Sequence, residues 1–150
     1  MKNQRSNIVP IDINAVKSRM LQVCGQQVLL DRDVAALYGV ETRIINQAVK
    51  NNPEKFPVGY VAELSSDELS ILQSKFLTAN ISSKSRVLPK VFAERGLYML
   101  ATILKGEQAV RTTLAIIETY AEVRAMKREL LALHTETDAQ KRKSMRPIEV

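Results

Sequence analysis

The stretch DRDVAALYGVETRIINQAVK, residues 31–50, contains the pattern that decides the fold. Asp31 offers a side-chain acceptor at the start of a helix, and a short helix over residues 32–38 follows. Gly39 ends that helix, because glycine adopts the left-handed backbone of a tight turn. A second helix is predicted from about Thr42 to Asn51, where the sequence Asn51-Asn52-Pro53 stops it.

The spacing within this stretch predicts a helix-turn-helix at about residues 31–52. Two short helices that cross closely need a small residue where they meet and a glycine in the turn, and Ala35 and Gly39 fit these needs. Ile45, Ala48 and Val49 then face back toward the first helix. An ordinary amphipathic helical hairpin is the alternative interpretation.

The other face of the second helix is entirely polar. In a helix-turn-helix this face enters the major groove of DNA. Arginine bonds guanine in bidentate fashion, and asparagine or glutamine does the same with adenine, whereas Lys50 and Asn51 better suit phosphates. We therefore expect double-stranded DNA as the partner. The candidate contact residues in this helix are Thr42, Arg43, Asn46, Gln47, Lys50 and Asn51.

The positive charge is concentrated in one segment. The chain has a formal net charge of +6. Residues 75–111 hold 7 basic and 2 acidic residues, whereas residues 1–74 are neutral overall and residues 112–150 carry +1. A local basic excess indicates a surface for an acidic partner. Residues 75–90 are predicted to form an exposed loop in which Lys84, Arg86 and Lys90 contact phosphates, and a merely solvated basic loop is the alternative.

The rest of the chain predicts an α+β fold. Residues 1–15 are expected to be a flexible lead-in, followed by a domain over residues 16–106. That domain opens with a small hairpin of two strands within Val16–Leu30, turning at Gly25-Gln26. Tyr60–Leu64 alternates like a strand.

Two further helices are expected before the C-terminal helix. Ser65 and Glu68 form a capping box for a helix that reaches about Lys75. Residues 92–104 are apolar on most sides and predict a largely buried helix, which Lys105-Gly106 breaks.

A long helix is predicted over residues 107–134, followed by a flexible polar tail over residues 135–150. Its apolar residues recur at helical spacing, first as Val110, Leu114, Ile117 and Ala121 and as Ile116, Tyr120 and Val123, and then as Leu130 and Leu131. The stretch Glu107–Leu133 has more apolar surface than one partner face within a small domain needs. We therefore expect a homodimer joined through it, with a monomer or a different protein partner as alternatives.

Three blocks of the sequence, in order, resemble the KilA-N superfamily, in particular its phage and bacterial branch named for "open reading frame six, N-terminal". The blocks are LDRDVAALYGVETRIINQAVKNNPEKFP, VLPKVFAERGLYMLATIL and EQAVRTTLAIIETYAEVR. The resemblance implies a DNA-binding transcriptional regulator of phage or prophage type. The alternative is an antirepressor or other protein-binding module that acts through residues 107–133, because the family also includes antirepressor-type proteins. The family motif falls on Leu37, Tyr38, Val40, Thr42, Asn46, Gln47, Ala48 and Val49.

Other function classes find little support. His134 is the only histidine and Cys24 the only cysteine, so neither an ordinary zinc site nor an intramolecular disulfide is expected. Cys24 is interpreted as a small buried hydrophobe. Helix capping accounts for Asp31 and solvent exposure for Asp33, and no phosphate-binding loop or nucleophile motif is present. We expect no enzyme activity, no cofactor, no signal peptide, no membrane partner and a cytoplasmic location.

Overall fold

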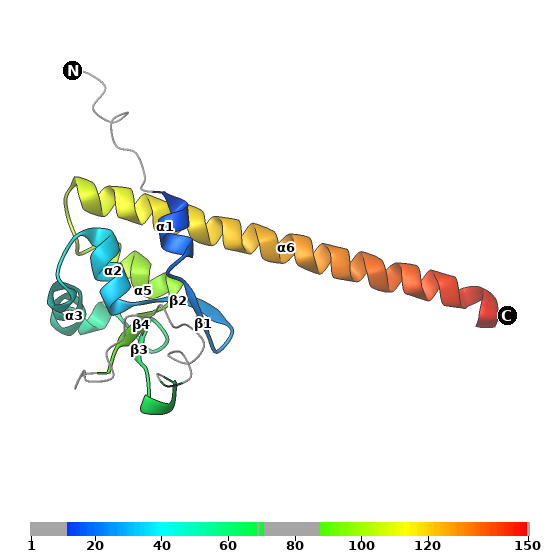
Figure 1. Ribbon diagram of the computed structural model, residues 1–150, viewed down its shortest axis with the longest axis horizontal. Helices are drawn as coiled ribbons and strands as arrows, with labels where there is room; N and C mark the ends of the chain where they lie inside the picture. The colour runs from blue at the N-terminus through cyan, green and yellow to red at the C-terminus, as the bar shows by residue number, and fades with distance from the viewer. Residues whose placement is uncertain (1–11, 69, 71–87, 150) are drawn as a thin grey trace, which may run out of the picture. The chain divides into compact units, whose positions relative to one another are not determined.

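The computed structural model describes residues 12–68, 70 and 88–149, and it describes side chains as far as Thr135. The chain divides into two units, Met1–Ile116 and Ile117–Val150. The first unit combines a four-stranded sheet with short helices, and the second is the greater part of the long helix α6, Glu107–Glu149 (Figure 1). The fold is therefore α+β, as the sequence predicts.

The sheet is antiparallel throughout, in the order β1-β2-β4-β3. The predicted hairpin is confirmed as β1 (Leu21–Val23) and β2 (Gln26–Leu30). Its turn lies one residue earlier than the predicted Gly25-Gln26, and Gln26 already pairs in β2. It consists of Cys24 and Gly25, whose φ values of 51° and 78° suit the two central residues of a tight hairpin turn. Cys24 is consequently exposed, and its interpretation as a buried hydrophobe is wrong.

The strand between β2 and β3 is absent from the sequence prediction. β4 covers Lys90–Phe92, where a loop and then the start of a helix were expected. It pairs with β2 on one side and with β3 (Val61–Glu63) on the other. Three residues are too few to show an alternating pattern, and both partners come from distant parts of the chain. The helix expected over residues 92–104 is shorter, α5 at Glu94–Ala101.

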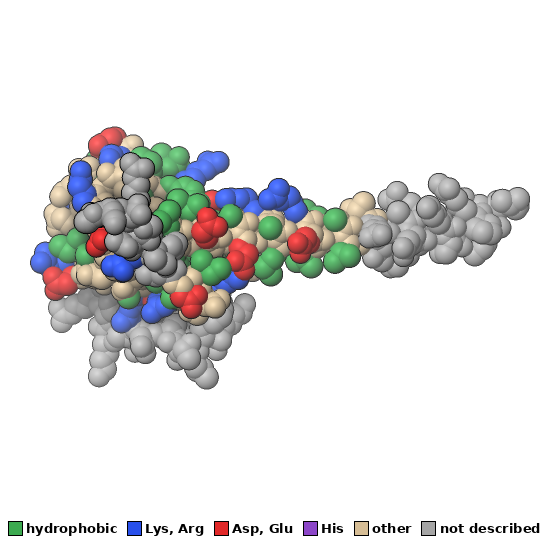
Figure 2. All heavy atoms as spheres, turned by 90° about the horizontal axis from the view of Figure 1, so that it is seen from above, with side chains coloured by type: hydrophobic (Ala, Val, Ile, Leu, Met, Phe, Trp, Pro, Cys, Tyr) green, Lys and Arg blue, Asp and Glu red, His purple; other side chains and the backbone are tan. Residues whose placement is uncertain are grey.

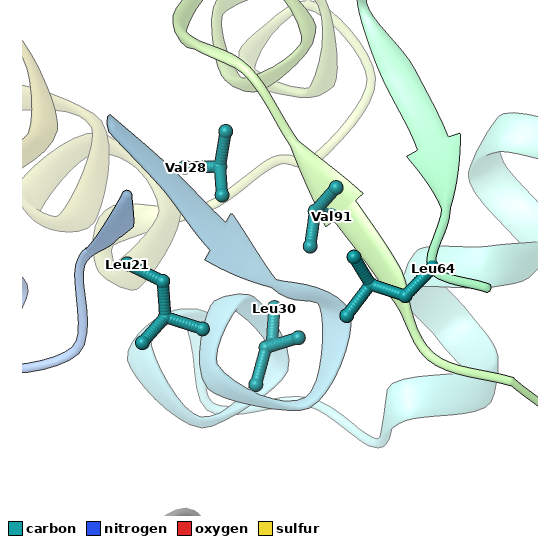
Figure 3. Packing of buried hydrophobic residues seen from close by; sticks show 5 residues of the cluster. All are labelled: Leu21, Val28, Leu30, Leu64 and Val91. Carbon is teal, nitrogen blue, oxygen red and sulfur yellow. The ribbon is translucent and has the colours of Figure 1, made fainter. Parts of the chain in front are cut away.

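Side chains on both faces of the sheet are buried, because neighbouring residues of a strand point in opposite directions. One core cluster gathers residues from three strands and from the segment after β3, which are Leu21, Val28, Leu30, Leu64 and Val91 (Figure 3). Between these positions Leu29 pairs with Phe92, and both side chains are fully buried. The sheet thus supplies a fixed base for the helix that follows β2 directly.

The two helices predicted from residues 31–52 are present with nearly the expected bounds, α2 at Asp31–Tyr38 and α3 at Thr42–Asn51. Gly39 lies between them with φ 71° and ψ 33°, the left-handed conformation that its position requires. Asp31 is not the helix cap: Leu30 has that position, and Asp31 is the first helical residue and is buried. The cap assignment is wrong because the helix begins one residue earlier; the Asp31 carboxylate accepts from the N–H of Arg32 with one oxygen and from α3 with the other.

A short helix precedes the hairpin. α1 covers Ile13–Lys17, within residues expected to be a lead-in and the start of a strand. Asp12 caps it by accepting a hydrogen bond from the backbone N–H of Asn14 at 2.9 Å, and Val16 is completely buried. The flexible lead-in predicted for residues 1–11 lies outside the described residues.

Helix α6 differs from the prediction in its buried face and in its end. Ile116 and Tyr120 are buried as predicted, but Val110 and Ile117 are 44% and 40% exposed, and two threonines, Thr112 and Thr119, are buried instead. The buried residues of α6 therefore include small polar side chains that lie outside the predicted apolar pattern. The helix also continues to Glu149, so the tail predicted to be flexible over residues 135–150 is helical as far as residue 149.

The capping box is confirmed: Ser65 N–H donates to Glu68 Oε1 at 2.8 Å, and Glu68 N–H donates to Ser65 Oγ at 3.1 Å. These bonds lower the pKa of the Glu68 carboxyl. The remainder of that predicted helix lies outside the described residues. In the described part of the chain, no helix has the length and apolar character needed to cross a membrane.

Candidate nucleic-acid interface

The inner face of α3 is anchored against α2. Ile45 is fully buried and Ala48 is 8% exposed, while Val34 and Ala35 of α2 are buried as well. The turn between the helices has three residues, Gly39 to Glu41, and the N–H of Val40 donates to the carbonyl of Ala35 at 3.0 Å. We call α2, this turn and α3 the two-helix unit. Its packing leaves the opposite face of α3 uncovered by α2.

Four of the six α3 residues predicted as contacts are exposed, and they share one side of the helix. Arg43, Gln47, Lys50 and Asn51 are all exposed. Residues four, seven and eight positions apart lie above one another on a helix surface. Together they place a guanidinium, an amide, an ammonium and a second amide along one row. We call these four side chains the α3 outer row.

Within this row Arg43 already has an acidic neighbour. Its Nη2 lies 3.1 Å from Glu41 Oε1, and its Nε donates to the same oxygen at 3.2 Å. The two side chains are 72% and 73% exposed, so the pair is in contact with solvent and contributes only about 0–1 kcal/mol. Arg43 can therefore exchange this partner for another acceptor at small cost.

Gln47 and Asn51 are linked along the helix. Gln47 Nε2 donates to Asn51 Oδ1 at 3.4 Å, which is a long and exposed hydrogen bond. A bond of this length holds both amides loosely on the surface. Their remaining donors and acceptors face outward for a ligand.

Asn46 does not belong to the outer row. Its Nδ2 donates to Asp31 Oδ2 at 3.1 Å, and its Oδ1 is buried without a hydrogen-bond partner in the described part of the chain. The other carboxylate oxygen of Asp31 accepts from the N–H of Arg32 at 2.8 Å. The buried Asp31 carboxylate thus draws the amide of Asn46 inward, away from the position expected of a side chain that faces a base. Asn46 instead links α3 to the first turn of α2.

Thr42 also differs from the outer row. It is the first residue of α3 and is only partly exposed. The residue before it, Glu41, has the cap position but makes no side-chain cap hydrogen bond. The first backbone N–H groups of α3, which lie near the exposed Arg43, therefore receive no cap from the Glu41 side chain.

The C-terminal end of α2 is supported by the beginning of α6, which no sequence pattern indicated. Thr112 Oγ1 donates to the carbonyl of Leu37 at 2.7 Å, and Gln108 Nε2 donates to the same carbonyl at 3.0 Å. The hydroxyl groups of Tyr38 and Thr113 lie 2.8 Å apart. Burial raises the pKa of the Tyr38 phenol, and the hydrogen bond to Thr113 opposes this rise. These contacts fix the turn from which α3 departs.

Asp33, on the other side of α2, is partly buried rather than fully solvated. Burial raises the pKa of its carboxyl, while the nearby Arg19 and Arg32 lower it by less. Arg19 Nε lies 3.9 Å from Asp33 Oδ1, so the segment between α1 and β1 lies beside α2. The carboxylate therefore has a structural neighbour and adds negative charge behind the two-helix unit.

The basic loop predicted as the second contact region is described only at its end. Lys84 and Arg86 lie outside the described residues. Lys90 is not in a loop: it is the first residue of β4, is partly exposed and pairs in register with Glu63 of β3. Its position in the sheet follows from the ladder with β3. Of the nine predicted contact residues, the structure thus brings four together, those of the α3 outer row.

A comparison with family models matches one of them, described as the ORF6N domain, over residues 18–103. The match begins just before β1 and ends just after α5. It therefore includes the whole sheet and the two-helix unit. No curated protein and no solved structure matches the chain.

Proposed function

The chain belongs to the ORF6N domain family, and from this premise we propose that it is a sequence-specific DNA-binding protein that inserts α3 into the major groove. The finer resemblance to the KilA-N superfamily points the same way, toward a regulator of phage or prophage type. The observation that carries the proposal is the α3 outer row, an exposed line of base-reading and phosphate-binding side chains on a helix anchored from behind.

The dimensions of α3 suit this role. A helix of 10 residues is about 15 Å long, and the major groove of B-DNA is about 12 Å wide and admits one α-helix. The three-residue turn with glycine is the connection found in DNA-binding helix-turn-helix units. Two short helices joined in this way present the second helix outward while the first supports it.

The roles within the outer row follow from side-chain chemistry. Arg43 offers a bidentate donor pair for guanine and Gln47 offers a donor and an acceptor for adenine. Lys50 and Asn51, at the end of the helix, are assigned to phosphates. Asn46 is assigned to positioning, because its amide holds α3 against Asp31. Lys84 and Arg86 remain proposed phosphate contacts.

Glu41 is expected to lower the affinity for DNA. Before Arg43 bonds a guanine it must leave Glu41, and the Glu41 carboxylate repels the DNA backbone. A bidentate contact with a base is worth about 1–3 kcal/mol, more than the exposed ion pair that it replaces. Replacing Glu41 by Ala should therefore strengthen DNA binding, while Arg43→Ala should weaken it.

The experiment begins with selection of a preferred site from random DNA, followed by fluorescence anisotropy with that site and with scrambled DNA. Arg43→Ala should cost about 1–3 kcal/mol on the selected site and little on scrambled DNA. Arg128→Ala on α6 is the matched control, since it removes the same charge from an exposed position outside the two-helix unit. Unchanged affinity in both Arg43→Ala and Gln47→Ala would reject α3 as the recognition helix.

Protein binding through α6 is the second candidate function, because α6 exposes large hydrophobic side chains. Salt separates the two functions. The affinity for DNA should fall steeply as the salt concentration rises, by about 0.9 in logarithmic slope per phosphate contact. An affinity for a protein partner through an apolar face should change little over the same range.

A further inference from the structure

Beyond the ORF6N domain, α6 exposes a seam of hydrophobic side chains. Met126, Leu130 and Leu133 are 53%, 64% and 60% exposed, and Val123 is partly exposed. Along the helix these residues follow one another at intervals of three, four and three. Hydrophobic residues at alternating intervals of three and four are the a and d positions of a heptad repeat.

We propose that this seam binds the same seam of a second copy of the chain, forming a parallel two-stranded coiled coil. In this register Val123 and Leu130 have position a, and Met126 and Leu133 have position d. Val123 at a and Leu133 at d are the choices that favour two strands over three or four, whereas Leu130 at a and Met126 at d do not carry that preference. Figure 2 shows that the surface of this part of the chain carries hydrophobic and charged side chains side by side.

The charges beside the seam argue for a second copy of this chain in particular. Positions g hold Glu122 and Glu129, and positions e hold Lys127 and His134. In a parallel pair, each g residue faces the e residue five positions later in the partner helix. Glu122 then faces Lys127 of the second copy, and Glu129 faces His134 of the second copy. The seam is therefore complementary to itself in charge where Glu122 faces Lys127, and Glu129 faces an imidazole that can hydrogen-bond to it.

The opposite orientation lacks this complementarity. In an antiparallel pair the g positions face each other and so do the e positions. Glutamates would then lie opposite glutamates, and neither glutamate would face Lys127. Like charges placed together are unfavourable, so the charge pattern selects the parallel pair.

The seam is short, which sets the strength expected of the dimer. From Val123 to Leu133 it extends for about 15–20 Å at 1.5 Å per residue. The next a and d positions are Thr137 and Gln140, which contribute no hydrophobic side chain. A small interface of this kind gives a weak and reversible dimer. Measurement therefore has to cover the micromolar range and above.

Leu131 supplies a matched control for the register. It is 66% exposed, nearly the same as Leu130, but it has position b and lies beside the seam. In sedimentation of the full chain without DNA, Leu130→Glu should weaken the dimer at least about tenfold, and Leu131→Glu should change it less than about twofold. Equal effects of the two substitutions, or a wild-type chain that is monomeric throughout, would overturn the proposal and leave this face to a different protein.

The orientation has its own test by disulfide cross-linking. In a Cys24→Ser background, Met126→Cys and Leu133→Cys should each form a dimer under oxidation, because every d residue faces itself in a parallel pair. In an antiparallel pair at most one level faces itself. Cross-linking at only one of the two positions, or at neither, would therefore exclude the parallel coiled coil.

The charge pairs can be tested without touching the seam. Lys127→Glu and Glu122→Lys should each weaken self-association, because each creates facing like charges. An equimolar mixture of the two variants should form a heterodimer, in which both pairs between positions 122 and 127 again join opposite charges. No gain on mixing would contradict the charge pairing.

The dimer and the DNA-binding function can fail independently. Leu130→Glu leaves the α3 outer row intact, so the monomeric variant should still bind a single half-site. Loss of self-association with half-site affinity retained is the result that we expect.

Discussion

Helix α3 and the part of α6 beyond residue 120 are both amphipathic, but α3 buries its hydrophobic side chains and this part of α6 exposes them. α3 buries Ile45 and Ala48 completely or nearly so and exposes only polar side chains on its outer row. The described residues of α6 from Met126 to Leu133 expose four large hydrophobic side chains. The apolar face of one helix is already covered within the chain, whereas that of the other is open to solvent.

This difference assigns different kinds of partner to the two regions. A polar outer face on an anchored helix recognises hydrogen-bonding groups and charges, which DNA provides. An exposed hydrophobic seam gains free energy only when another apolar surface covers it. Recognition and self-association are therefore expected to reside in separate parts of the chain. The following predictions test that separation, beginning with the largest expected effect.

The packed domain should tolerate no added atom at Gly96 in α5. A Cβ there would coincide with the backbone carbonyl of Tyr60, whose oxygen accepts the Ala93 N–H at 3.1 Å. Backbone cannot move aside as a flexible side chain can. Gly96→Ala should lower the free energy of unfolding by about 3 kcal/mol or more, measured by urea denaturation. Arg95→Ala, an exposed neighbour, is the control and should change it by less than about 0.5 kcal/mol.

Asn46 and Gln47 should separate positioning from recognition within α3. Asn46→Ala removes the donor to the buried Asp31 carboxylate and should cost about 1–3 kcal/mol of stability. Gln47→Ala should leave stability unchanged but weaken binding to selected DNA. If Asn46→Ala has full stability in thermal unfolding, the link between α2 and α3 that we describe is not important.

Stability at high pH should depend on Tyr38. Burial raises the pKa of this phenol in the folded chain above its unfolded value of about 10. The stability that the neutral phenol contributes is complete below the unfolded pKa and is lost as the pH rises through the folded pKa. At neutral pH, Tyr38→Phe should cost about 1 kcal/mol, because the hydrogen bond to Thr113 is lost.

The difference in unfolding free energy between wild type and Tyr38→Phe should then shrink as the pH rises above about 10. The other tyrosines titrate in both proteins and cancel from the comparison. A difference that stays constant across this range would show that Tyr38 ionises alike in the folded and unfolded chains.

The smallest effects are expected for the monomer stability of α6 variants. At concentrations where the chain is monomeric, Leu130→Glu and Leu131→Glu should each change the free energy of unfolding by less than about 0.5 kcal/mol. Both leucines are already mostly exposed. A large loss for either one, observed by circular dichroism at low concentration, would mean that the side chain is buried within the single chain.

Features that depend on neighbouring residues were predictable from the sequence. The bounds of α2 and α3, the left-handed Gly39 and the capping box of Ser65 and Glu68 follow from short-range backbone preferences. The exposed polar positions Arg43, Gln47, Lys50 and Asn51 follow from helical periodicity once Ile45 and Ala48 are identified as the inner side. Each of these inferences needs only a few consecutive residues.

Tertiary structure alone decided the features whose partners are distant in the sequence. β4 exists because Leu29 of β2 and Val61 of β3 both pair with Phe92. The sequence of residues 90–92 does not by itself indicate that a strand lies on each side. Asn46 turns inward because Asp31, fifteen positions earlier, is buried beside it. Helical periodicity determines which residues share a face, but the face that becomes buried and the polar side chains that are drawn inward depend on the element packed against it.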